Sequence, residues 1–123
     1  MRIELSNGRQ FIIKLSYTKT YKSTCKKDEW GREIFTSWIE RGTVCTIEEL
    51  FKKKKHSGIL YIGRSHCHYM DRFDKIVGRG KAYFNAITEM ANQGVLSEPE
   101  FNEMFKFELN AQVKSMKKEA ENG

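Results

Sequence analysis

The spacing of apolar residues changes near Asp71, and this change restricts the folds that the chain can adopt. Before Asp71 apolar and polar residues alternate, as at Phe11, Ile13 and Leu15, which is typical of a strand with one buried face. After Asp71 apolar residues recur at spacings of three and four, which indicates amphipathic helices. Strands followed by helices predict an α+β fold.

The first 68 or so residues carry the strand signals. Asn7-Gly8 lies between two strand-like runs and predicts a hairpin turn, because both residues tolerate positive φ. A second turn is predicted around Trp30-Gly31, and the run after it, rich in β-branched and aromatic residues, is interrupted only by Gly42. Residues 52–58, which begin with four lysines, connect this run to another strand candidate. We therefore expect an N-terminal antiparallel β-sheet of about five strands.

Two C-terminal helices are predicted after the sheet, at about residues 71–92 and 97–118. Asp71 is the expected N-terminal cap of the first helix, and Ser97 begins a capping-box pattern for the second. The apolar stripe of the first helix consists of Phe73, Ile76, Val77, Gly80, Phe84, Ile87 and Ala91. The 123 residues are enough for one hydrophobic core, so we expect a single domain spanning residues 1–123.

Charge and composition restrict the class of partner. The formal net charge of +6 makes an anionic partner plausible. No apolar run approaches the roughly 18 residues that span a bilayer, and the N-terminus lacks the apolar segment of a signal peptide, so we expect a cytoplasmic protein with no membrane partner. Three widely spaced cysteines favour reduced thiols over a disulfide framework.

The His66-Cys67-His68 triplet raises the question of a metal site. Adjacent residues of a strand point to opposite faces, so only His66 and His68 could reach the same ion. No second pair of ligands with zinc-site spacing accompanies them. We therefore predict no metal and no cofactor, with histidines beside a buried thiol as the plainer interpretation.

No convincing catalytic set is visible in the sequence. A cysteine nucleophile needs an oriented base and an oxyanion site, and a triplet of neighbouring residues provides neither. Asp71 and Asp74 stand three residues apart at a predicted helix start, where they complement the helix dipole. We therefore expect a protein that is not an enzyme.

A basic strip borders the apolar stripe of the first predicted helix. Arg72, Lys75 and Arg79 follow each other at spacings of three and four, and Tyr83 lies one turn further along. Such a strip can be a solvated flank whose long side chains cover the edge of the core. Gly78 and Gly80 favour a ligand or a tightly packed neighbour, since each glycine costs a helix about 1 kcal/mol relative to alanine.

Residues 41–90 resemble a pattern found in small bacteriophage proteins. In these proteins a strand pair ends in a G-x-(A/S)-x-C-x-x-x-D-x-(F/Y) segment and continues into a G-R-x-x-A helix. The matching positions here are Gly63, Ser65, Cys67, Asp71, Phe73, Gly78 and Arg79. The segment 80–84 departs from the pattern, which has a more aliphatic helix. The family that this chain resembles is the first described Thoeris anti-defence family, whose members sequester cyclic ADP-ribose signals.

The resemblance implies a viral protein that acts as a sponge in the host cell cytoplasm. Such a protein binds a glycocyclic ADP-ribose made by host immune enzymes and holds it without degrading it, so that the Thoeris effector is not activated. Arginines would bind the two phosphates, Tyr83 or Phe84 would stack on the adenine, and Asn92 would make a directional polar contact. The expected ligand-binding residues are Arg64, Arg72, Lys75, Arg79, Tyr83, Phe84 and Asn92.

Two other functions compete with the sponge. A small nucleic-acid-binding phage protein would suit the charge of +6, the lysines at 52–55 and the aromatic residues scattered among basic ones. A hydrolase that uses His66 or His68 ranks third, because no carboxylate metal ligands cluster nearby.

The second predicted helix carries more large apolar residues than one stripe on a sheet requires. These are Phe101, Met104, Phe105, Phe107 and Leu109. An excess of exposed apolar surface is typical of an interface, so we expect a homodimer or a higher homo-oligomer.

Overall fold

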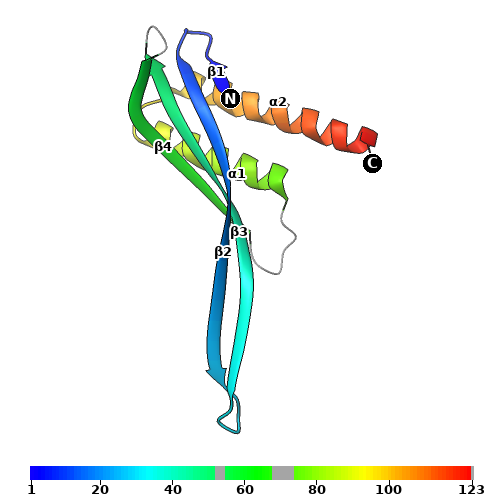
Figure 1. Cartoon of the computed structure of the whole chain (residues 1–123). Coiled ribbons are helices and arrows are strands. Elements are labelled where there is room, and N and C mark those ends of the chain that lie inside the picture. Colours follow the sequence, from blue (N-terminus) through cyan, green and yellow to red (C-terminus); the bar gives the residue numbers. More distant parts are fainter. Residues whose placement is uncertain (52–54, 68–73, 123) are drawn as a thin grey trace.

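The computed structural model describes residues 1–51, 55–67 and 74–122, and it shows four strands followed by two helices. The elements are β1 (Arg2–Glu4), β2 (Gln10–Lys27), β3 (Glu33–Phe51), β4 (Lys55–Cys67), α1 (Lys75–Asn92) and α2 (Glu98–Asn122) (Figure 1). The α+β fold class is confirmed, with four strands where the sequence predicted about five.

The strands form one antiparallel sheet in chain order, β1-β2-β3-β4. The predicted turn at Asn7-Gly8 joins β1 to β2, and Gly8 has a φ of 92°. The turn between β2 and β3 is also where the sequence predicts it: Asp28 accepts hydrogen bonds from the backbone N–H groups of Trp30 and Arg32, and Gly31 has a φ of 77°. Both turns use a glycine in a backbone conformation that other residues rarely adopt.

Strand β3 passes through Gly42 without a break, which is why the sheet has fewer strands than predicted. A Cβ atom at Gly42 would lie 2.6 Å from the carbonyl oxygen of Ser65 on β4 and 2.9 Å from Oγ1 of Thr18 on β2. Because Gly42 has no side chain, β2 and β4 can lie close to β3 at this point, and β3 continues through it.

The helix boundaries differ from the prediction at two ends. Helix α1 begins at Lys75, four residues later than predicted, because the cap is Asp74: its Oδ1 accepts hydrogen bonds from the N–H groups of Ile76 (2.9 Å) and Val77 (3.4 Å). The predicted cap, Asp71, lies outside the described residues. Helix α2 continues four residues past the predicted end, to Asn122.

The core lies between one face of the sheet and the two helices. Helix α1 packs against β3 and β4, and α2 packs against α1. The buried apolar residues come from the sheet, from α1 and from α2. The largest of them are Phe11, Ile13, Ile47, Tyr83, Ile87, Met90 and Met104. Within the described part of the chain, neither helix is long and apolar enough to cross a membrane.

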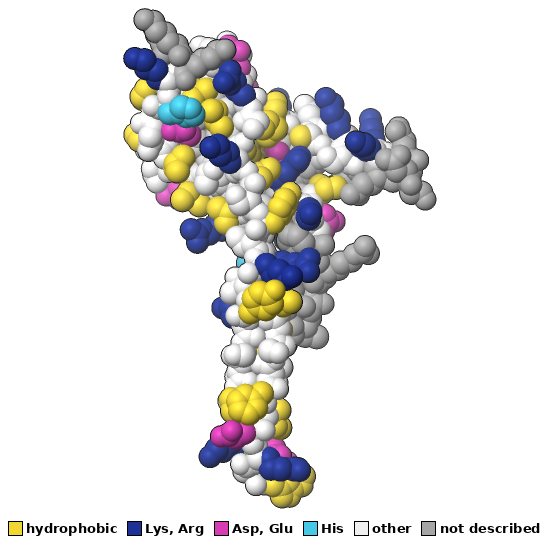
Figure 2. Space-filling view, in the orientation of Figure 1, with side chains coloured by type: hydrophobic (Ala, Val, Ile, Leu, Met, Phe, Trp, Pro, Cys, Tyr) yellow, Lys and Arg dark blue, Asp and Glu magenta, His cyan; other side chains and the backbone are white. Residues whose placement is uncertain are grey.

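Strands β2 and β3 extend far beyond the rest of the sheet. The last residue of β4, Cys67, pairs with Arg41, so residues 20–27 and 33–40 pair only with each other among the described strands. We call residues 19–41 the arm, and it projects away from both helices (Figure 1). Figure 2 shows apolar side chains exposed along the arm, with charged side chains gathered near its end.

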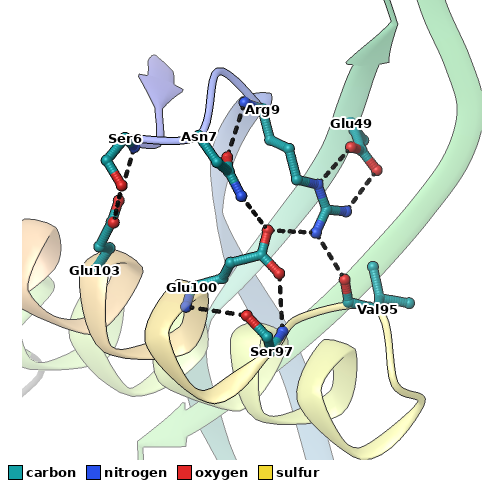
Figure 3. Close-up of polar contacts among 8 residues, drawn as sticks. All are labelled: Ser6, Asn7, Arg9, Glu49, Val95, Ser97, Glu100 and Glu103. Atoms are coloured by element: carbon teal, nitrogen blue, oxygen red, sulfur yellow. Dashed lines mark hydrogen bonds and ion pairs between the residues drawn. The ribbon is translucent and has the colours of Figure 1, made fainter.

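A network of polar contacts fastens the start of α2 to the β1–β2 turn and to β3 (Figure 3). Arg9 makes two hydrogen bonds to the carboxylate of Glu49, of 2.8 and 2.9 Å, and a 2.7 Å ion pair with Glu100. Arg9 also donates to the carbonyl of Val95 at 2.9 Å. One turn further along α2, Glu103 accepts from both the backbone N–H and the hydroxyl of Ser6. Arg9, which is partly buried, is thus the residue of this network that joins β3 to α2.

Replacing Arg9 by alanine should lower the free energy of unfolding by about 2 to 3 kcal/mol, because it removes charge-assisted hydrogen bonds to two carboxylates. The matched control is Arg32→Ala at the exposed turn of the arm, whose 2.9 Å pair with Asp28 should be worth less than about 1 kcal/mol. Urea unfolding followed by circular dichroism measures both. Equal losses for the two variants would contradict the role given to Arg9.

Acid should weaken the same network. Burial alone would raise the pKa of Glu100, but hydrogen bonds from Ser97, Arg9 and Asn7 outweigh it and lower the pKa to about 2. Since this value lies below the ordinary 4.5, the stabilisation is complete above pH 4.5 and is lost as the pH falls towards 2. We expect the urea midpoint to fall across this range, and to fall less steeply in Glu100→Gln. An unchanged slope in Glu100→Gln would contradict the assignment.

Candidate functional site

A cavity of about 550 Å³ opens between β4, α1 and α2. Its lining comes from residues 64–66 of β4, from one side of α1 between Val77 and Asn85, and from α2 between Phe105 and Gln112. We call it the cleft. Its volume lies in the range of small-molecule sites, which are usually largely apolar with a few polar groups.

One wall of the cleft is apolar and aromatic. Phe84 of α1 meets Phe105 of α2 edge to face, with ring centroids 5.7 Å apart and an interplanar angle of 72°. Val77 and Leu109 extend this wall along the two helices. All four residues remain two-fifths to one-half exposed, so a planar ring can reach this wall from solvent.

The rim along β4 and α1 is basic. Arg64, His66 and Lys81 line it. Among the described residues no ion pair joins Arg64 or Lys81 to a carboxylate, whereas His66 lies 3.3 Å from Glu40. Two exposed cations without an internal partner can bind an anion at this rim.

The rim is held in place by hydrogen bonds between β4 and α1. Asn85 donates to the carbonyl of Arg64, and Ser65 donates to the carbonyl of Gly78, each at 2.8 Å. These bonds fix the strand that carries Arg64 against the helix that carries Lys81. The two cations therefore stand on rigid elements.

The inner end of the cleft is polar and closed to solvent. Glu108 is only 5% exposed and forms a 3.0 Å ion pair with Arg79 through Oε1, while its Oε2 has no hydrogen-bond partner among the described residues. The hydroxyl of Tyr83 donates to the carbonyl of Met104 at 2.8 Å. Burial, together with the charge of Glu108, raises the pKa of Tyr83 and raises that of Cys45 to about 12.

Two glycines bring the three elements together. A Cβ atom at Gly63 of β4 would lie 2.1 Å from the carbonyl oxygen of Ala82 and 2.3 Å from the nitrogen of Ala86, so the backbone of α1 lies directly on the strand. A Cβ atom at Gly80 would lie 1.7 Å from Nε2 of Gln112 on α2. The tightly packed neighbour that the sequence predicts for Gly80 is therefore the side chain of Gln112.

The structure brings only some of the predicted binding residues to the cleft. Arg64 and Phe84 line it, and so does Tyr83, although Tyr83 is buried and its hydroxyl is already bonded. The predicted strip is not a single surface: Arg79 is paired with Glu108, and Nζ of Lys75 lies 5.0 Å from the ring centre of Tyr17.

Two further predicted residues lie elsewhere. Asn92 is exposed at the last position of α1 and does not line the cleft, and Arg72 lies outside the described residues. The cleft instead adds residues that the sequence did not single out for a site, among them Lys81, Glu108 and Gln112. The spacing of residues within a helix predicts which of them share a face, but it does not predict which residues of α2 pack beside those of α1.

The described residues contain no candidate metal cluster, and comparison with known proteins gives no match. Within residues 1–51, 55–67 and 74–122, no three or more histidine, cysteine, aspartate or glutamate side chains are grouped to hold an ion, and His68 lies outside these ranges. No protein-family model, curated protein or solved structure matches the chain.

The two glycines should respond differently to alanine. In Gly63→Ala the new methyl group meets the backbone of α1, so we expect the free energy of unfolding to fall by about 2 to 3 kcal/mol. In Gly80→Ala the obstacle is the end of a flexible glutamine, and the gain in helix propensity of about 1 kcal/mol offsets its displacement. Urea unfolding of both variants measures this, and equal losses would contradict the close approach at Gly63.

Proposed function

We propose that the chain is a phage anti-defence sponge that binds and sequesters a glycocyclic ADP-ribose signal in the cleft without degrading it, which blocks activation of the Thoeris effector. The observation that carries the proposal is the pairing of an aromatic wall with a basic rim in one cavity of about 550 Å³. The resemblance of residues 41–90 to the Thoeris anti-defence family supplies the identity of the ligand.

The ligand-binding residues follow from the lining of the cleft. Arg64 and Lys81 bind the phosphates, because they are the cations of the rim that have no internal carboxylate among the described residues. Phe84 and Phe105 contact the adenine, since their rings meet edge to face and both are partly exposed. Tyr83 supports the site from inside, because its buried hydroxyl is already bonded to Met104.

Binding without turnover fits the chemistry of the inner end. The Cys45 thiol is fully buried outside the lining of the cleft, and with its pKa raised to about 12 it stays protonated at neutral pH and is a poor nucleophile. Glu108 is engaged by Arg79. These features support a protein that holds its ligand rather than one that transforms it.

Calorimetry with cyclic ADP-ribose and its glycocyclic isomers tests the proposal. Lys81→Ala should weaken binding by about 1.5 to 3 kcal/mol, the range for hydrogen bonds to charged groups, and Phe84→Ala by about 0.5 to 1.5 kcal/mol. The matched control is Lys26→Ala on the arm, which should leave the affinity unchanged.

Three results would contradict the proposed function. The first is that no cyclic ADP-ribose isomer binds. The second is an equal loss of binding free energy in Lys81→Ala and Lys26→Ala, which would indicate the diffuse electrostatics of a nucleic-acid-binding protein. The third is recovery of a cleaved nucleotide when the complex is heated and its supernatant is examined by mass spectrometry, which would make the protein an enzyme.

A further inference from the structure

The carboxylate of Glu108 has one oxygen that the fold leaves without a partner. Among the described residues that line the cleft, Glu108 alone has a buried side-chain oxygen, Oε2, that makes no hydrogen bond. Its side chain is 6% exposed, and its other oxygen, Oε1, accepts from Nε of Arg79 at 3.0 Å. Native proteins keep few buried acceptors unpaired, because the loss is largest for charged groups. Oε2 is therefore a candidate for a bond to a bound molecule.

The chemistry of Oε2 restricts the group that can bind there. A carboxylate oxygen accepts hydrogen bonds and donates none, so its partner must be a donor. A phosphate offers only acceptors and a charge of the same sign, which disfavours it at this closed end of the cleft. Because Arg79 already supplies a cation to the same carboxylate, a neutral N–H or O–H group is sufficient to complete it. The cleft thus suits a ligand with anions at one end and a neutral donor at the other.

The position of Glu108 on α2 indicates which donor of a nucleotide it meets. Glu108 and Phe105 stand three residues apart on the helix, so their side chains are neighbours on one face. A base on the wall formed by Phe84 and Phe105 therefore has an edge near Glu108. The ribose joins the base to the phosphates and so lies towards the rim, whereas the exocyclic amine of adenine is a donor on the edge of the base.

We propose that Oε2 of Glu108 accepts a hydrogen bond from the exocyclic amine of adenine, which makes Glu108 the residue that selects this base. The assignment rests on the proposed function, because it takes the adenine on the aromatic wall and the phosphates on the rim from there. It adds discrimination between bases: a base with no donor at this position leaves the carboxylate oxygen buried and unpaired.

Gln112 is the side chain that can give the amine access. Oε2 is closed to solvent, so a donor reaches it only when a neighbouring group moves. Gln112 lines the cleft one turn beyond Glu108, and its amide fills the space that a side chain at Gly80 would take. Its hydrogen bond to the carbonyl of Ile76 is 3.5 Å long, at the weak limit for such bonds. Changes of side-chain rotamer are common on binding, so we expect Gln112 to turn aside when the ligand enters.

Calorimetry with two matched ligands tests the role of Glu108. The ligands are glycocyclic ADP-ribose and its analogue in which purine replaces adenine, so that a hydrogen atom stands in place of the amine. The wild type should bind the adenine compound roughly 10- to 100-fold more tightly, the range for one hydrogen bond to a charged group. Lys81→Ala should weaken both ligands by the same factor and keep this preference, because both carry the same phosphates.

Glu108→Gln should remove the preference for adenine. Glutamine keeps an oxygen for Arg79 but places an amide donor where Oε2 stands, so it no longer accepts from the amine. The two ligands should then bind within about threefold of each other, mainly through weaker binding of the adenine compound. The matched control is Glu89→Gln, an exposed residue of α1 outside the cleft lining, which should leave both affinities unchanged. The urea midpoint of Glu108→Gln shows whether it folds, and the wild type with the two ligands is decisive without the variant.

The outcomes separate this inference from the proposed function. Equal affinity of the wild type for the two ligands would overturn the role of Glu108 and leave the proposed function intact. A preference for adenine that survives in folded Glu108→Gln would also overturn it, because another residue would then bind the amine. Binding of neither ligand would contradict the proposed function and, with it, the assignment of Glu108.

Discussion

The close approach of α1 to β4 at Gly63 is the contact on which the rest of the molecule depends. Because Gly63 has no side chain, the backbone of α1 at Ala82 and Ala86 lies on the strand, and both alanines are fully buried. This approach turns Tyr83 and Ile87 into the core and leaves Lys81 and Phe84 facing the cleft. The contact that closes the core thus also orients the residues proposed to bind the ligand.

Helix α2 completes the cleft, and polar contacts rather than apolar area alone determine its position. Arg9 ties its first turns to β3, and the pair of Arg79 with Glu108 ties its middle to α1. These two connections lie on either side of Met104, which is fully buried. The distance between Phe84 and Phe105 is therefore set partly by Arg9, which lies in a turn outside the lining of the cleft.

The fold class could be predicted from the sequence because strands and helices differ in the local spacing of their apolar residues. The change of apolar spacing, the Asn7-Gly8 turn and the second turn at Gly31 all appear in the structure as predicted. Strand β3 was misjudged at Gly42 because a glycine that ends a strand and one that admits a neighbouring strand look the same in a sequence. The site was only partly predictable for a similar reason: Arg64 and Phe84 lie in the resembling segment, whereas Glu108 and Phe105 reach the cleft only through packing of α2.

The ion pair of Arg79 with Glu108 is partly buried, and it gives this arginine a role other than the one its place in the sequence predicts. On the helix it belongs to a basic strip, but in the fold it neutralises Glu108, whose Oε2 still lacks a hydrogen-bond donor among the described residues. A phosphate placed beside that oxygen would meet a like charge in a region closed to water, which is unfavourable, whereas a ribose hydroxyl or an amino group would donate to it. The proposed binding mode would therefore place the phosphates of the nucleotide at Arg64 and Lys81 on the rim and a hydrogen-bond donor towards Glu108.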